Sequence, residues 1–98
     1  MGSGVSLGLV VTTSWDDGHS LDMRLADVLD KYGIRGTFYV AKSYMNSRLT
    51  DSEIVELSER HEVGAHTLTH PALPKIPIQE AAKEIRGSKL WLEDLLRT

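Results

Sequence analysis

Short apolar, β-branched segments alternate with segments of helical periodicity along this chain, and that alternation constrains the fold more than any other feature. Three segments predict strands, at residues 7–13, 37–40 and 62–66. Three others predict helices, at residues 20–32, in a short segment that opens at residue 50, and at residues 77–96. Strands that alternate with helices form right-handed crossovers and a parallel sheet. The sequence therefore predicts an α/β fold of three βα units.

Turn and capping residues mark the boundaries of these elements. An Asp-Asp-Gly signal at residues 16–18 ends the first predicted strand, and Gly33 lies where a helix C-cap belongs. Thr50 and Glu53 have the spacing of a capping box. Apolar residues at helical spacing are expected to face the core from the first and third helices: Leu21, Leu25, Val28 and Leu29, then Ile78, Ala82, Ile85, Leu92 and Leu96.

Size and charge narrow the class of protein. The 98 residues suffice for one domain with a modest core. We interpret residues 1–6 as a tag or flexible tail and residues 7–98 as the domain. A net charge of −3 with interspersed signs provides no basic stripe for nucleic acid. No run approaches the ~18 apolar residues of a membrane span, and the compartment stays unassigned. Because the chain has no cysteine, any metal must be held by nitrogen and oxygen.

His66 and His70 are four residues apart and could share a metal ion. Along a strand, positions i and i+4 lie about 13 Å apart, too far for one ion. On a helical turn they are neighbours, about 5–6 Å apart between Cβ atoms. We therefore expect the third strand to end near His66 and residues 67–70 to form a turn. The alternative is that both histidines lie by chance in a loop bounded by proline and share no metal ion.

Asp16 and Asp17 are adjacent, and neighbouring strand residues point to opposite faces of a sheet. They can serve one site only where the strand gives way to a loop, which Gly18 provides. Ordinary turn chemistry is the alternative interpretation. Both motifs, however, follow predicted parallel strands, and α/β proteins bind ligands at the carboxyl ends of such strands. One Asp with two His is a familiar ligand set for a divalent metal, and a second Asp could serve as a base.

Residues 13–18 read T-S-W-D-D-G and residues 66–70 read H-T-L-T-H. They resemble the first two signature motifs, T-F-D-D-G and H-[ST]-x-x-H, of the polysaccharide deacetylases, the NodB-homology group of carbohydrate esterase family 4. Residues 36–40 and 62–66 resemble the second and third strands of that family. The resemblance covers nearly the whole chain, so residues 7–98 look like a partial NodB-like deacetylase domain.

The resemblance implies a role for each motif residue. Asp17, His66 and His70 would be the metal ligands, and Asp16 would be the catalytic base that activates a metal-bound water. The metal would be zinc, with cobalt or nickel as alternatives. The reaction would be hydrolysis of N-acetyl groups, or of O-acetyl groups on some sugars, with an acetylated carbohydrate as substrate. The fold would be the first part of a distorted (β/α) barrel.

Two departures from the family pattern keep other interpretations open. Trp15 replaces the commoner Phe, as in relatives that hydrolyse non-peptide C–N bonds of small molecules. The later family motifs, including the one that supplies the general acid, do not occur in the chain, whereas a (β/α) barrel takes ~250 residues. The chain could thus be a non-catalytic metal-binding fragment. It could also be a self-assembling partial barrel, a homo-oligomer formed through exposed strand edges.

Two further residues are candidates for the same site. His19 follows the Asp-Asp-Gly turn and could act as a substitute acid, although a solvated loop histidine is the alternative. Tyr44 could line a substrate groove.

Overall fold

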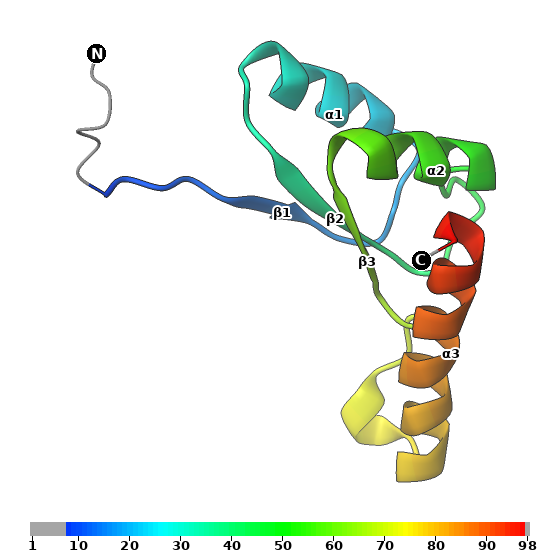
Figure 1. The fold of residues 1–98 in the computed structure, drawn as a ribbon. Coiled ribbons are helices and arrows are strands. Elements are labelled where there is room, and N and C mark those ends of the chain that lie inside the picture. The colour runs from blue at the N-terminus through cyan, green and yellow to red at the C-terminus, as the bar shows by residue number, and fades with distance from the viewer. Residues whose placement is uncertain (1–7, 98) are drawn as a thin grey trace.

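The protein alternates three strands with three α-helices, as predicted (Figure 1). The computed structural model describes residues 8–97. In chain order the elements are β1 (Thr13–Trp15), α1 (Asp22–Lys31), β2 (Gly36–Val40), α2 (Asp51–Arg60), β3 (Glu62–Ala65), the 3-10 helix η2 (Leu73–Lys75) and α3 (Ile78–Leu96). This order confirms the α/β class with three βα units. The tail predicted at residues 1–6 lies outside the described residues, as does the first residue of the predicted first strand.

The sheet is parallel and has the order β1-β2-β3. Phe38 in the middle of β2 pairs with Trp15 of β1 and with Val63 of β3. Phe38 and Val40 are completely buried and form the centre of the core. Helices α1 and α2 lie together over one side of the sheet (Figure 1). Helix α3 begins beyond the sheet and passes β3, and its carboxyl-terminal end lies beside α2. The carboxyl ends of all three strands therefore lie at one edge.

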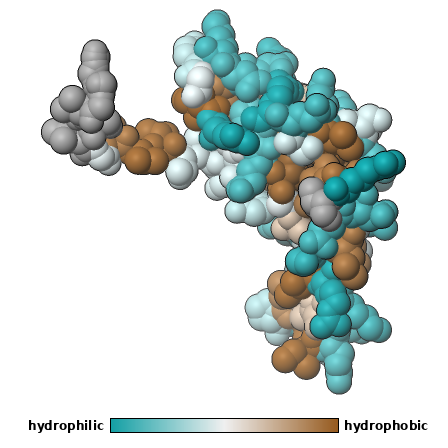
Figure 2. Space-filling model, viewed as in Figure 1, coloured by the Kyte–Doolittle hydropathy of each residue, from teal (hydrophilic) through white to brown (hydrophobic). Residues whose placement is uncertain are grey.

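The prediction of a buried strand through residues 9–11 is wrong. Leu9, Val10 and Val11 are 85%, 79% and 63% exposed, and β1 begins only at Thr13. The register explains the difference, because Thr13 pairs with Gly36, where β2 itself begins. The preceding residues extend beyond the end of the sheet as an arm with an apolar surface (Figures 1 and 2).

The helix boundaries follow the predicted caps. Gly33 has a left-handed φ of 67° just after α1. Thr50 Oγ1 accepts a hydrogen bond from Glu53 N, and Glu53 Oε1 accepts one from Thr50 N, which completes the capping box of α2. On α1 the predicted stripe is only half buried: Leu29 is in the core, Leu25 packs against it, and Leu21 and Val28 are exposed.

The predicted apolar stripe of α3 is also only partly buried. Leu92 is 6% exposed and Leu96 packs against the core, whereas Ile78 and Ile85 are 82% and 54% exposed. Figure 1 shows the reason, since only the carboxyl-terminal half of α3 lies beside the sheet and α2. The amino-terminal half extends past the sheet together with η2.

Candidate metal centre

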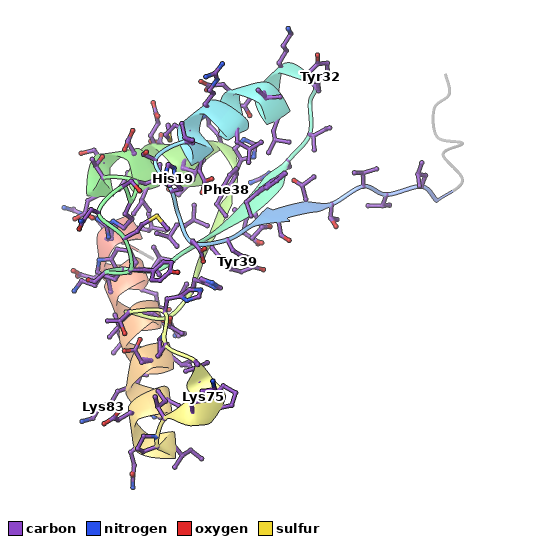
Figure 3. All side chains as sticks on the ribbon, turned by 180° about the vertical axis from the view of Figure 1, so that it is seen from behind. His19, Tyr32, Phe38, Tyr39, Lys75 and Lys83 are labelled. Atoms are coloured by element: carbon purple, nitrogen blue, oxygen red, sulfur yellow. The ribbon has the colours of Figure 1, made fainter. Side chains whose placement is uncertain are left out.

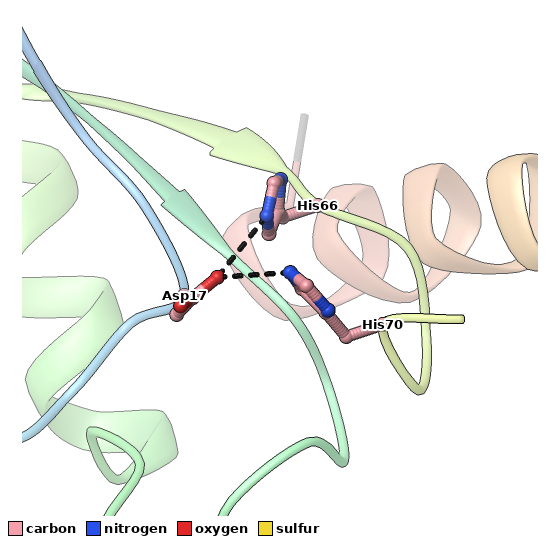
Figure 4. Close-up of side chains that lie close together, drawn as sticks. All are labelled: Asp17, His66 and His70. Atoms are coloured by element: carbon pink, nitrogen blue, oxygen red, sulfur yellow. Dashed lines mark ion pairs between the residues drawn. The ribbon is translucent and has the colours of Figure 1, made fainter. Parts of the chain in front are cut away.

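Three polar side chains from the ends of two strands meet at the carboxyl edge of the sheet (Figure 4). Asp17 follows β1, and His66 directly follows β3. His70 returns to the same place after a bend in the chain. Strand β2 separates β1 from β3, so the parallel crossovers bring together residues about fifty positions apart.

The geometry of the three side chains fits one divalent ion. Asp17 Oδ1 lies 3.2 Å from Nε2 of His66 and 3.2 Å from Nε2 of His70. One ligand atom from each residue lies within 4.8 Å of the others. Ligands that each lie about 2.0–2.2 Å from a tetrahedral ion are about 3.3–3.6 Å apart, close to the spacing found here. The three side chains are 30–37% exposed, so solvent and substrate can reach the group.

The Asp17 carboxylate is directed by an unusual turn. Asp17 and Gly18 both have left-handed backbones, with φ of 80° and 77°. A Cβ on Gly18 would lie 2.7 Å from Val40 Cγ1, so the turn packs directly against β2. Gly18 O accepts a hydrogen bond of 2.9 Å from Leu49 N. The Asp-Asp-Gly turn is thus fixed on two sides, and Asp17 points across the end of β2.

The two histidines are held by a bend after β3, where their spacing predicted a helical turn. The bend contains two left-handed residues, Thr67 with φ of 67° and His70 with φ of 58°, so it is not a turn of α-helix. His66 N donates to Val40 O at 3.1 Å, and His70 N donates to Thr67 Oγ1 at 3.1 Å. The bend places the two imidazole rings 4.9 Å apart between centroids.

Two residues outside the ligand set contact this bend: Glu84, which the sequence did not single out, and Tyr44, which it offered as a groove residue. Glu84 of α3 accepts hydrogen bonds of 2.9 Å from Leu68 N and from Thr69 N at Oε1. Thr69 Oγ1 donates to Oε2 at 2.8 Å. Tyr44 stacks on the ring of His70 at 4.2 Å between centroids and 23° between planes. Nothing in the sequence distinguishes Glu84 from the other charges of an amphipathic helix.

Asp16 and His19 lie outside the ligand group. Asp16 is exposed, and no hydrogen bond or ion pair among residues 8–97 involves its carboxylate. His19, labelled in Figure 3, accepts a hydrogen bond at Nδ1 from Leu21 N, which ties its ring to the start of α1. Its backbone forms a bridge with Arg48. The structure thus leaves the Asp16 carboxylate open to solvent and gives His19 a local structural contact.

Comparison with known proteins identifies the family. Residues 7–98 match the polysaccharide deacetylase family. The chain belongs to this family. The following two relatives are longer deacetylases. Peptidoglycan-N-acetylmuramic acid deacetylase PdaC of Bacillus subtilis is 31% identical over 88 residues, which are 88% of this chain and 19% of that protein. Peptidoglycan-N-acetylglucosamine deacetylase PgdA of Listeria monocytogenes is 33% identical over 79 residues, 76% of this chain and 16% of that protein.

A solved structure confirms that the fold is shared with a deacetylase. Streptococcus pyogenes deacetylase PplD, solved with acetate, superposes with a TM-score of 0.84 at 22% sequence identity. The match covers 95% of this chain and 44% of that one. This member of the polysaccharide deacetylase family thus spans less than half of the solved deacetylase and less than a fifth of the two curated relatives. Within residues 8–97, no helix has both the length and the apolarity that a bilayer span requires.

Proposed function

We propose that this chain carries the metal-binding part of a divalent-metal-dependent deacetylase, with Asp17, His66 and His70 as the ligands. The observation that supports it most is the pair of 3.2 Å distances from Asp17 Oδ1 to the two imidazole Nε2 atoms. Three protein ligands leave coordination positions open, which is typical of catalytic rather than structural sites. Zinc suits this nitrogen and oxygen donor set, and cobalt or nickel are the alternatives.

Asp16 is the proposed base. When bound, the ion would supply Lewis-acid polarisation of the acetyl carbonyl and would make a nearby water more acidic. Asp16 adjoins a ligand in the chain, and its carboxylate is exposed and without a protein partner among the described residues. It accepts the proton of the attacking water, whose oxygen adds to the acetyl carbon. The C–N bond then breaks as the leaving nitrogen takes up a proton, either the one held by Asp16 or one from solvent, and acetate and an amine are the products.

The proposed substrate is an N-acetylated polysaccharide, with peptidoglycan first. The names of the two curated relatives assign them to N-acetylmuramic acid and N-acetylglucosamine of peptidoglycan. Tyr44 offers a flat apolar face beside His70 and is 45% exposed. An aromatic face next to the reaction centre suits the apolar face of a sugar ring.

Zinc titration by calorimetry tests the site. The unmodified chain should bind one zinc ion, and His66→Ala or His70→Ala should reduce the affinity by at least about 100-fold, because a lost ligand leaves only two. His19→Ala is the matched control, since it removes an imidazole outside the ligand group and should leave the affinity unchanged. Undiminished zinc binding by both ligand variants would eliminate the site.

Acetate release tests the reaction. Zinc-loaded protein should release acetate from N-acetylated peptidoglycan fragments or from acetylated chito-oligosaccharides. Asp16→Asn should abolish the release while retaining zinc affinity, because it removes the base and not a ligand. Zinc binding without any turnover of either substrate or of a small acetamide would favour the non-catalytic metal-binding interpretation.

The exposed arm before β1 favours self-assembly as a second proposal. Within residues 8–97, β1 and β3 each pair with β2 alone, and Leu9, Val10 and Val11 are 63–85% exposed. An apolar segment beside an open strand edge favours pairing with another strand. Sedimentation should then give a mass above that of one chain, and Val10→Lys should lower it. A monomeric mass at all concentrations would exclude this proposal.

A further inference from the structure

The histidine bend is held from outside the ligand set. We propose that Glu84 is a positioning residue of the metal centre, and that its carboxylate fixes the bend at residues 67–70 so that His66 and His70 face Asp17. This inference rests on the metal site of the proposed function, and it assigns to α3 a role in that site.

The contacts of Glu84 are directed at the backbone between the two histidines. Oε1 accepts from two consecutive amides, Leu68 N and Thr69 N, both at 2.9 Å. Oε2 accepts from Thr69 Oγ1 at 2.8 Å. Hydrogen bonds to an ionised acceptor are stronger than neutral ones. The hydrogen bond from Thr69 N is the largest cause that lowers the pKa of Glu84 below its ordinary value of 4.5.

The bend requires such support because its backbone is unfavourable by itself. Thr67 and His70 both have positive φ, which residues other than glycine rarely adopt. Without an external partner, an isolated segment of this kind would populate other conformations, and a metal would have to select the competent one. The carbonyls of Thr67 and Leu68 accept hydrogen bonds from Lys42 N and Ser43 N, and Glu84 supplies the acceptor for the two amides between the histidines.

Helix α3 is built to approach the bend. Gly87 lies three residues after Glu84 on α3, and a Cβ there would be 2.8 Å from Leu68 Cδ1. A glycine inside a helix is destabilising, so close packing of Leu68 gives this one a reason. The carboxyl-terminal half of the helix is anchored in the core through Leu92. Figure 3 shows the other half, marked by Lys83, running beside the segment that leads from the bend to η2.

Zinc affinity of the full chain and three variants tests the role of Glu84. Glu84→Ala removes all three hydrogen bonds, whereas Glu84→Gln keeps an acceptor oxygen for the two amides. Glu80→Ala removes a carboxylate one turn earlier on the same helix and is the matched control. Circular dichroism and thermal melts establish that each variant is folded at the temperature of the titration. If Glu84→Ala does not fold, Glu84→Asp replaces it, because the shorter side chain keeps the charge but loses the reach.

We expect Glu84→Ala, or Glu84→Asp in its place, to weaken zinc binding about 10- to 100-fold, the usual effect of losing a partner that orients metal ligands. Glu84→Gln should restore most of the affinity, and Glu80→Ala should match the unmodified chain. A general loss of stability does not predict this pattern, because it would lower the melting temperature without a selective change in affinity.

Two results would overturn the inference. One is a folded Glu84→Ala variant, or its Asp substitute, with zinc affinity within twofold of the unmodified chain. The other is an equal loss of affinity in Glu80→Ala. Both differ from failure of the proposed function, in which the unmodified chain itself would not bind zinc.

Discussion

Replacing Gly18 by alanine should destabilise the fold by about 2–5 kcal/mol, and the structure separates two contributions to this cost. Gly18 has a φ of 77°, in a region where an L-residue costs about 1–2 kcal/mol. Its added Cβ would also lie 2.7 Å from Val40 Cγ1 and 3.2 Å from Val40 Cβ and Cγ2. Overpacking of a core typically costs about 1–3 kcal/mol. Val40 is fully buried and β-branched, so it has little freedom to move aside.

Gly33→Ala is the matched control for backbone strain. Gly33 has a similar φ of 67°, but an added Cβ would have no neighbour within 4 Å. The free energy of unfolding of this variant should therefore fall only by the cost of backbone strain, about 1–2 kcal/mol. The difference between the two variants measures the contact with Val40.

Urea denaturation followed by circular dichroism measures both losses. With a slope of about 2 kcal/mol/M, Gly18→Ala should lower the midpoint by roughly 1–2.5 M and clearly more than Gly33→Ala. Because Gly18 adjoins Asp17, zinc affinity should also fall in Gly18→Ala and stay constant in Gly33→Ala. Equal midpoints in the two variants would refute the packing of the Asp-Asp-Gly turn against β2.

Two further predictions concern buried polar groups. Burial is the largest cause that raises the pKa of Asp22 above its ordinary value of 3.8, so its protonated form is favoured in the folded state and stability is lost as the pH rises through the raised pKa. Asp22→Asn should therefore raise the urea midpoint at pH 7 and leave it unchanged below pH 3.8. A gain that does not change with pH would contradict the assignment. His61 is 2% exposed and accepts a hydrogen bond from Gly36 N at Nδ1. His61→Leu should therefore lower the free energy of unfolding by about 1–3 kcal/mol, because it leaves a buried amide without its acceptor. An unchanged urea midpoint would show that this hydrogen bond contributes nothing.

Local patterns in the sequence predicted the elements and the motifs well. The capping box of α2 and the left-handed Gly33 depend on residues within one turn of each other, so the sequence contains all the interacting groups. The bend after His66 followed from a similar argument, because four residues of strand cannot bring two imidazoles together.

Burial at the ends of the elements could not be predicted in the same way. The apolar residues before Thr13 read as a buried strand, and those at the start of α3 read as a core stripe, yet both groups are exposed. Periodicity shows which side of an element is apolar, but only the register of β1 on β2 and the path of α3 decide how far the sheet reaches.

For the candidate metal centre, too, some features follow from the sequence and others only from the tertiary structure. The sequence by itself determined the candidate parts, since the two histidines and the Asp16-Asp17 pair stand out by type, spacing and position after predicted strands, and the family resemblance selected Asp17 as the ligand. Only the tertiary structure decided that Asp17 Oδ1 lies 3.2 Å from both imidazoles, and that Glu84 supports the bend. Those contacts join residues 15 to 53 positions apart. Sequence patterns encode interactions between near neighbours, whereas these depend on crossovers and helix packing that form only when the whole chain folds.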